Sequence, residues 1–165
     1  MPRPVWRPLR FEDLDPLCGV AAAVHPSLPE RREVFEEKLR LFPAGCFALD
    51  SAGALAGYAI SHPWRLYEVP PLDAFLERLP DASDGLYLHD VAVTPAARGH
   101  GAGAALIERL SDIARKKGLG AIALTSVYGS DALWRKLGFE AALDNRLAGK
   151  LNSYGSSATY MIVRV

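Results

Sequence analysis

Hydrophobic and polar positions alternate along the chain in segments that predict a mixed α/β domain. Short apolar or alternating runs, bounded by Gly, Pro or Asp, predict strands at residues 3–10, 46–50, 54–61, 86–93, 121–127, 139–143 and 158–165. Apolar residues at helical spacing predict helices at residues 11–24, 30–41, 72–79, 101–117 and 130–137. No internal repeat or low-complexity tract interrupts this order, so the sequence predicts one domain over residues 1–165.

The composition is that of a globular chain with an ordinary hydrophobic core. Half of the residues are hydrophobic and 23% are charged. At this size folding buries about two-thirds of the unfolded surface, so the core needs no metal or disulfide. Cys18 and Cys46 lie in apolar stretches, and we expect reduced packing residues. With no apolar run of about 20 residues and no apolar region at the N-terminus, we expect a cytoplasmic protein that does not bind membranes.

The charges cancel overall but are unevenly distributed. Nineteen basic and nineteen acidic residues argue against a nucleic-acid partner. Residues 1–85 carry nine Lys and Arg against thirteen Asp and Glu, and residues 86–165 carry ten against six. The two halves therefore differ, at −4 and +4. This pattern indicates either ordinary solvated faces or an anionic ligand on the second half, with a cationic ligand near the first.

A glycine-rich turn at residues 94–103 is the most informative part of the sequence. It reads Thr-Pro-Ala-Ala-Arg-Gly-His-Gly-Ala-Gly, follows an apolar strand and leads into a helix. Glycines let main-chain N–H groups converge on an anion at the positive end of a helix, and Arg98 adds a positive charge beside them. We therefore predict a phosphate-binding turn, with a connector that binds no ligand as the alternative.

Two common phosphate-binding motifs fit this turn poorly. A P-loop requires Gly-Lys-Ser/Thr, whereas the residues after Gly101 are Ala-Gly-Ala-Ala. Gly99, Gly101 and Ala104 fit the dinucleotide-binding fingerprint, but that fingerprint also requires an acidic residue at the end of the next strand. The next strand reads Ala-Ile-Ala-Leu-Thr-Ser-Val, and the first acid after it is Asp131. A nicotinamide cofactor therefore stays only as the minority alternative.

A third pattern fits better. Arg-x-x-Gly-x-Gly at residues 98–103, preceded by Val-x-Pro at residues 93–95, resembles the acyl-CoA pyrophosphate loop of the GNAT family of N-acetyltransferases. Trp-Arg-Lys-Leu-Gly-Phe at residues 134–139 resembles the closing Tyr-x-x-x-Gly-Phe motif of that family. The two motifs occur in the family's order, with a helix and a strand between them. The resemblance covers residues 86–140, and the first 85 residues resemble the family only in the order of their elements.

This resemblance implies both a fold and an activity. The fold is an α/β acyltransferase domain with a mixed central sheet, a splayed fourth strand and flanking helices. The implied activity is transfer of an acetyl group from acetyl-CoA to a primary amine of a small molecule or peptide by direct attack, without a metal. The alternatives are transfer of a longer acyl group, acetylation of a protein lysine or N-terminus, and a non-catalytic acyl-CoA-binding module. A homodimer stays open.

The resemblance also implies the residues that hold acetyl-CoA. The main chain of Val91 and Val93 would pair with the pantetheine arm, because the strand at residues 86–93 splays from its neighbour in this fold. The closing motif adds Trp134. The pyrophosphate would contact the main chain of Arg98, Gly99, His100, Gly101, Ala102 and Gly103.

His89 is the predicted proton acceptor. Strand alternation places Tyr87, His89, Val91 and Val93 on one face, just upstream of the acyl arm, and Asp90 on the other face unless a bulge turns it. The spacing from His89 to the loop resembles that of strand histidines that deprotonate the amine in members of this family. An imidazole suits this task at neutral pH. The alternative is a buried, hydrogen-bonded histidine.

The general acid is missing from its usual place. Trp134 stands where the family has its acidic tyrosine, and an indole N–H is no usable acid. Val127 stands where the family often has Asn. We predict that Tyr154, before a glycine in a polar loop, closes the site as proton donor or acceptor-positioning group. Tyr128 and Tyr160 are the alternative donors. Tyr154 could instead be a surface tyrosine without a role in the reaction.

The acceptor pocket is implied at residues 25–40 and 62–84. Three aromatic residues could form its walls, or belong to the core, namely Trp64, Tyr67 and Phe75. Four acids of the first segment could attract an amine, or form a solvated helix face, namely Glu30, Glu33, Glu36 and Glu37.

Overall fold

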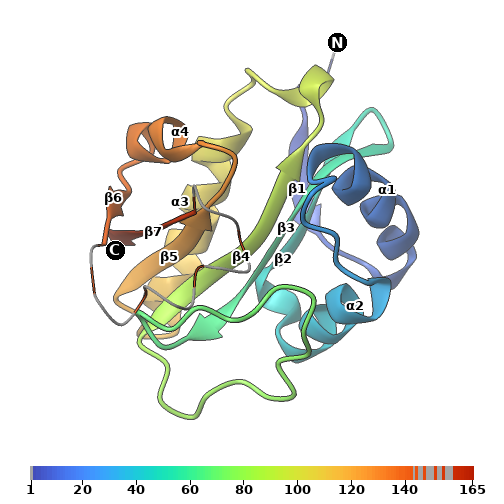
Figure 1. Ribbon diagram of the computed structural model, residues 1–165. Coiled ribbons are helices and arrows are strands. Elements are labelled where there is room, and N and C mark those ends of the chain that lie inside the picture. The colour runs from blue at the N-terminus through green and yellow to red at the C-terminus, as the bar shows by residue number, and fades with distance from the viewer. Residues whose placement is uncertain (1, 143, 145–146, 148–150, 152–153, 155–157) are drawn as a thin grey trace.

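One mixed sheet organises the chain. The computed structural model describes residues 2–142, 144, 147, 151, 154 and 158–165. In this part of the chain seven strands are ordered β1-β2-β3-β4-β5-β7-β6, and β4 and β5 are the parallel pair (Figure 1). The strands are β1 (Val5–Pro8), β2 (Cys46–Ser51), β3 (Ala54–Trp64), β4 (Gly85–Val93), β5 (Ala121–Ser126), β6 (Glu140–Ala141) and β7 (Thr159–Arg164).

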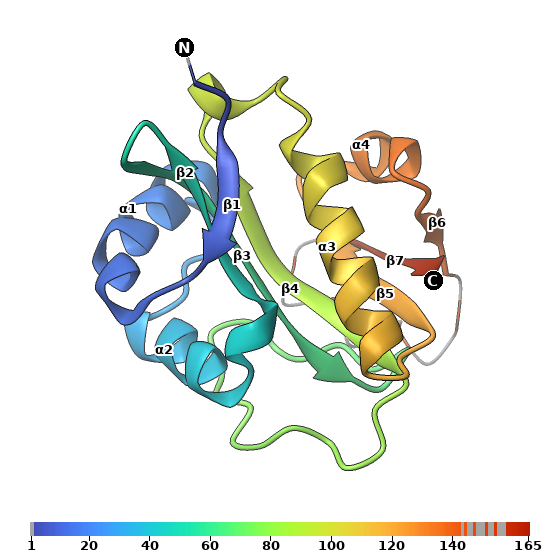
Figure 2. The same ribbon diagram turned by 180° about the vertical axis from the view of Figure 1, so that it is seen from behind.

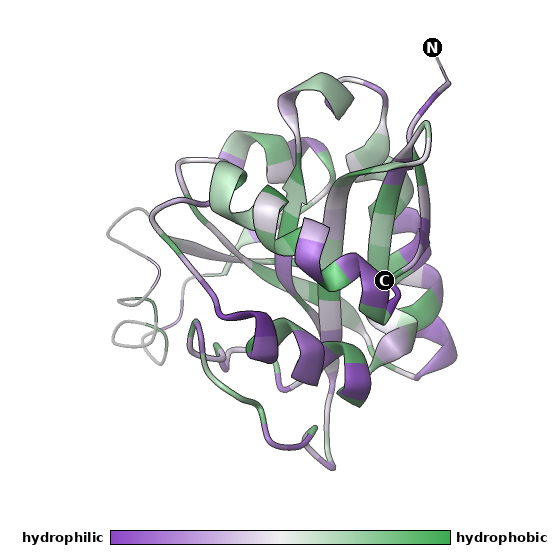
Figure 3. Ribbon diagram, turned by 90° about the vertical axis from the view of Figure 1, so that its right-hand side faces the viewer, coloured by the Kyte–Doolittle hydropathy of each residue, from purple (hydrophilic) through white to green (hydrophobic). Residues whose placement is uncertain are grey.

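Helices cover both faces of the sheet. They are α1 (Leu14–Val24), α2 (Arg32–Leu41), α3 (Ala102–Lys116) and α4 (Asp131–Lys136). Helices α1 and α2 lie on one face, and α3 and α4 on the other (Figures 1 and 2). Helices α2 and α3 mix hydrophilic and hydrophobic residues, because one stripe of each packs on the sheet, and Figure 3 shows such mixed helices in purple and green. No helix of the described residues has both the length and the apolar character that a membrane span needs.

The observed elements agree with the predicted ones to within a few residues, except at residues 72–79. The domain has the mixed sheet and flanking helices that the sequence predicts. Leu143, the end of one predicted strand, lies outside the described residues. Cys46 is buried, Cys18 is half-buried, and both are free thiols.

The helix predicted at residues 72–79 is wrong, because these residues belong to a loop. Asp73 and Glu77 have left-handed backbones, with φ of 51° and 67°. The main-chain N–H groups of Leu76 and Glu77 donate to the carboxylate of Glu37, over 2.6 and 2.9 Å. Glu37 belongs to α2 and is buried. A carboxylate from another element therefore takes the N–H groups that a helix would bond internally.

Strand β4 changes its pairing at His89. Ile60 of β3 pairs with Asp90 and Ser61 pairs with Leu88, so His89 is an extra residue in a β-bulge. Strand β5 pairs with β4 only over Leu86–Leu88. Beyond this point, in the described chain, β4 and β5 separate, and β4 offers main-chain groups to the gap.

The bulge also reverses which side chains share a face. Val91 and Val93 pack with the core beneath α3, together with Leu88. His89 contacts the ring of Tyr87 on the opposite face, at a centroid distance of 5.6 Å. The prediction that Tyr87, His89, Val91 and Val93 share one face is therefore wrong. Asp90 takes the same face as His89, which is the outcome that we expected only if a bulge turned it.

Gly57 allows β3 to approach the end of β4 closely. It pairs with Val93, and a Cβ atom at this position would lie 2.5 Å from the carbonyl oxygen of Ala92 and 3.2 Å from the Cα atom of Val93. Both neighbours are backbone, so neither can yield without moving the strand that borders the gap.

We predict that Gly57→Ala lowers the free energy of unfolding by about 1–3 kcal/mol, since the added methyl group overpacks the β3–β4 pair. Gly120→Ala is the matched control, because a Cβ atom there meets no atom within 4 Å. Urea unfolding of both variants and the wild type measures the difference. Equal stability of the two variants would contradict the prediction.

Candidate functional site

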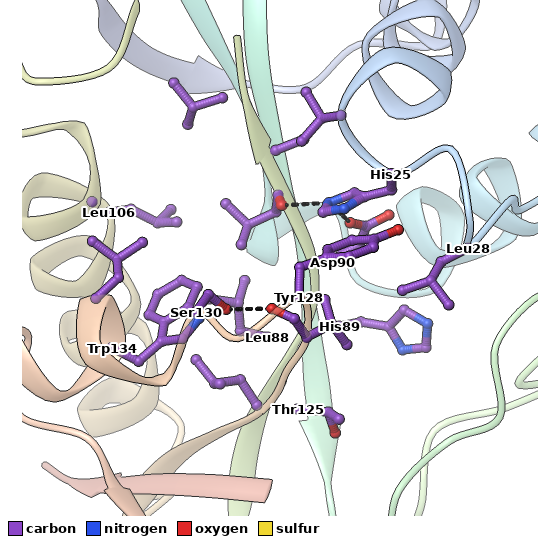
Figure 4. A pocket seen from close by; sticks show the side chains of 18 of the residues that line it. His25, Leu28, Leu88, His89, Asp90, Leu106, Thr125, Tyr128, Ser130 and Trp134 are labelled. Carbon is purple, nitrogen blue, oxygen red and sulfur yellow. Dashed lines mark hydrogen bonds and ion pairs between the residues drawn. The ribbon is translucent and has the colours of Figure 1, made fainter. Parts of the chain in front are cut away.

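A cavity of about 560 Å³ lies where β4 and β5 separate. Its walls come from the end of β4, the first turns of α3, the segment after β5 and the segment between α1 and α2. Figure 4 shows His25, Asp90 and His89 on one side of β4, and Leu106 and Trp134 on the other. The cavity therefore joins the two predicted motifs to the segment between the first two helices.

One end of the cavity suits an anion. Gly99 and Gly101 have left-handed backbones, with φ of 80° and 76°, and Gly101 is the N-cap of α3. The first helical N–H bond runs from Ala105 to the carbonyl of Gly101, so the N–H groups of residues 102–104 have no partner within the helix. No acid lies in this first turn. The predicted loop thus leads into a helix start whose free N–H groups have the arrangement that suits an anion.

The middle of the cavity is bordered by the main chain of Val91 and Val93. Thr94 N–H donates to Ala56 of β3, so by strand alternation the groups of Val91 and Val93 face the gap. Their carbonyl oxygens have side-chain partners in this structure. Arg98 Nε donates to Val93 over 2.9 Å, and His25 Nε2 donates to Val91 over 2.9 Å.

His25 lines the cavity, and the sequence pointed to it only as the first residue of the predicted acceptor segment 25–40. It is the C-cap of α1, and its Nε2 atom lies 3.4 Å from Asp90 Oδ1. Its ring stacks on Tyr128, with centroids 5.7 Å apart. Burial would lower the pKa of His25, but the bonds to Asp90 and the Val91 carbonyl hold that pKa above its ordinary value. Tyr58 donates to the other oxygen of Asp90, which fixes this carboxylate.

His89 lies in the cavity wall between a carboxylate and a second histidine. Its Nε2 atom is 3.6 Å from Glu30 Oε2, and its Nδ1 atom is 3.4 Å from His62 Nε2. The side chains of His89 and Glu30 are only 1% and 2% exposed. Sequence reasoning named Glu30 only as one of four acids and missed His62. The one available signal for His62 was a histidine in an otherwise apolar strand.

The pKa values of this cluster follow from burial and from its neighbours. Burial holds the pKa of His62 well below its ordinary value, so His62 is neutral. Burial would raise the pKa of Glu30, but the contacts with His89, Lys38 and the Asp73 N–H hold it below its ordinary value. Glu30 is therefore an enclosed carboxylate that bears its charge.

Trp134 of the closing motif and Tyr154, which we predicted to close the site, are both buried. Trp134 is buried, and its ring packs edge-on against Phe139 beside the cavity. Tyr154 also lines the cavity but is only 5% exposed, and its hydroxyl donates to the Pro70 carbonyl over 2.6 Å. The alternative reading of Tyr154 as a surface tyrosine is therefore wrong. Burial raises the pKa of Tyr154, so the phenol keeps its proton.

The two alternative tyrosines differ in exposure. Tyr160 belongs to the core, and its hydroxyl accepts the N–H of Tyr67. Tyr128 is 50% exposed and has a left-handed backbone, with φ of 54°. Tyr128 is therefore the tyrosine of the cavity that solvent reaches most easily.

The three aromatic residues named as possible acceptor walls do not line the cavity. Trp64 and Tyr67 pack against the core that contains Tyr87 and Tyr160, and Phe75 is half-exposed under Arg31. In the described part of the chain, the two predicted acceptor segments contribute Leu28, Leu72 and Glu30 to the cavity wall instead. No group of three or more His, Cys, Asp or Glu among the described residues is placed to hold a metal ion.

The fold resembles many solved structures. Ard1 from Thermoplasma volcanium is 16% identical, with a TM-score of 0.74 and 99% of each chain covered. The GphF GNAT-like decarboxylase in complex with isobutyryl-CoA is 20% identical, with a TM-score of 0.74, covering 97% of this chain and 98% of that one. The ribosomal-protein-S18-alanine N-acetyltransferase from Escherichia coli is 22% identical, with a TM-score of 0.69, covering 98% and 94%. At these identities the likeness shows the fold alone.

Sequence comparison gives the family. No curated protein matches the chain at a significant level. The model of the acetyltransferase (GNAT) family matches residues 10–139, which include the helix-start loop, the bulged strand and the closing motif. The chain therefore belongs to the GNAT acetyltransferase family.

Proposed function

We propose that this protein is an N-acetyltransferase that moves an acetyl group from acetyl-CoA to the primary amine of a small molecule or peptide. The observation that carries this proposal is the shared cavity of the helix-start loop and the splayed strand β4, with a histidine in its wall. Solved structures of the same fold support it, because several of them are complexes with CoA or isobutyryl-CoA. A peptide acceptor gains support from the NatC complex bound to a Gag peptide and CoA.

In this proposal the loop and the strand hold the cosubstrate along its length. The N–H groups of residues 102–104 and the left-handed glycines Gly99 and Gly101 receive the pyrophosphate, with Arg98 and His100 beside it. The main chain of Val91 and Val93 pairs with the pantetheine amides. His25 and Arg98 therefore share or release the carbonyls of these two residues when the arm binds. Trp134 packs beside the thioester end.

The proposed reaction moves the acetyl group from the sulfur of the thioester to the nitrogen of the amine. The amine nitrogen forms a bond to the thioester carbonyl carbon, and the bond from that carbon to sulfur breaks. An ammonium acceptor loses two protons on the way to the amide. One goes to His89, directly or through one water, and from there to solvent. The leaving sulfur takes the phenolic hydrogen of Tyr154, our proposed donor, and the second proton of the amine replaces it on Tyr154.

A non-catalytic acyl-CoA-binding module is the second candidate. Two observations favour it: Trp134 replaces the family's acidic tyrosine, and the His89 side chain is 1% exposed. Thiol release from acetyl-CoA with a panel of amines and peptide N-termini decides between the two. Turnover with at least one acceptor supports the enzyme, whereas tight CoA binding without turnover supports the module. The same assay with longer acyl-CoA esters tests the acyl length.

The first prediction concerns the loop. Gly101→Val should weaken acetyl-CoA binding about tenfold or more, because a β-branched residue with φ of 76° strains the turn that directs the N–H groups. Calorimetric titration measures the affinity.

Gly118→Val is the matched control for backbone strain. Gly118 ends α3 with φ of 71°, meets no atom within 4 Å of an added Cβ atom, and lies outside the cavity. This variant should lose similar stability and keep its affinity for acetyl-CoA. Equal losses of affinity in both variants would show that the loop is not the binding site.

The second prediction concerns the base. His89→Ala should lower kcat by about 10²- to 10⁴-fold, the usual contribution of a general base. The KM for acetyl-CoA should stay close to that of the wild type, because the loop is untouched. Steady-state rates between pH 5 and 9 measure both. A variant that keeps the acidic limb of the wild-type profile would point to another base.

The third prediction concerns the acid. Tyr154→Phe should lower kcat, since a phenol with a raised pKa can still donate to the leaving thiolate, whereas Phe cannot. Tyr128→Phe is measured beside it, as the exposed alternative. A fall of less than about threefold in both variants, roughly 0.65 kcal/mol in the barrier, would mean that water protonates the sulfur.

A further inference from the structure

The hydrogen bonds around His62 determine its tautomer. His62 Nδ1 lies 3.1 Å from the carbonyl oxygen of Pro63, which can only accept. The hydrogen of the neutral ring is therefore on Nδ1, and Nε2 carries a lone pair. Because His62 is fully buried, its ring has no solvent partner that could change this assignment.

This assignment passes to His89 through their contact. His89 Nδ1 lies 3.4 Å from the lone pair of His62 Nε2, so His89 must donate from Nδ1. The second nitrogen, Nε2, is then the one that gains or loses a proton. Among the described residues Nε2 has no hydrogen-bond partner, although it is buried and lines the cavity.

Glu30 is the charged group closest to this open nitrogen. Its Oε2 atom is 3.6 Å away and also accepts the N–H of Asp73 over 3.1 Å. In neutral His89 with its hydrogen on Nδ1, the lone pair of Nε2 faces the Glu30 carboxylate, and neither group can donate a hydrogen bond to the other. This arrangement favours an N–H donor of a bound ligand that lies within reach of both groups.

We propose that Glu30 is the positioning residue of the base, and that Glu30, His89 and His62 form one chain in which the outer two groups direct the proton to Nε2 of His89. The chain rests on the proposed acetyl transfer. Its proton comes from the ammonium of the acceptor. Glu30 stabilises the imidazolium that forms, and the proton then leaves for solvent.

The other titratable groups around His89 do not replace Glu30 in this role. On β4, burial raises the pKa of Tyr87 to about 12, so Tyr87 is uncharged at neutral pH. Asp90 is engaged by Tyr58 and His25. Tyr154 donates to Pro70. On α2, the enclosed Lys38 donates to the carbonyl of Ala74, and its charge acts on Glu30 and His62.

The test is Glu30→Gln, which keeps an oxygen for the Asp73 N–H but removes the charge. The acidic limb of the kcat profile should move down by about 1–3 pH units, since an opposite charge within 4–6 Å favours the protonated form by that amount. Glu33→Gln is the control, because Glu33 is an exposed carboxylate of α2 outside the cavity. Its limb should coincide with that of the wild type.

Nitrogen-15 spectra of the histidines in the full chain give a readout without activity. In spectra of the neutral rings, both His62 and His89 should show the tautomer with hydrogen on Nδ1. A spectrum with His89 hydrogen on Nε2 would overturn the proposal, as would a Glu30→Gln variant whose kcat falls while its acidic limb stays in place. A chain that shows the expected tautomers but acetylates no amine would refute the acetyl transfer and leave the tautomer assignment standing.

Discussion

The bulge at His89 is the constraint on which the rest of the site depends. One extra residue in β4 reverses the side-chain alternation, so Leu88 and Val91 face α3 while His89 and Asp90 face α1 and α2. Pairing with β5 ends at Leu88. The gap between β4 and β5 therefore begins where two titratable side chains turn toward the face of α1 and α2. A regular strand would place Val91 and Val93 on the face of α1 instead.

The site is also divided by charge. At one end the positive start of α3 and Arg98 suit phosphate groups, and at the other end Glu30 and Asp90 place two carboxylates near two histidines. Glu30 comes from the acidic first half of the chain and Arg98 from the basic second half, whereas Asp90 is an acid of the second half. Attraction of an anion and of a cation to separate ends allows both ligands to occupy one cavity.

Much of the fold could be predicted from the sequence, because most elements carry their own periodicity. The loop at residues 94–103 could be predicted as well, since its glycines and Arg98 are contiguous. The bulge could not, because a register shift is a property of two strands and leaves no pattern in one of them. The segment at residues 72–79 has helical spacing, but Glu37, about forty residues earlier, binds its N–H groups. Glu30 and His62 join His89 only after β3, β4 and α2 have packed.

The loop at residues 72–79, which borders the cavity beside Glu30, is held mainly through its backbone. Glu30 and Glu37 bind the N–H groups of Asp73, Leu76 and Glu77, and those groups exist whatever side chain a residue carries. Apart from Asp73, whose carboxylate also binds Arg31, the side chains of this loop can therefore vary during evolution while its main chain stays bound. In the proposed enzyme, such variation would change which amines fit, while the sheet, the bulge and the helix-start loop stay the same.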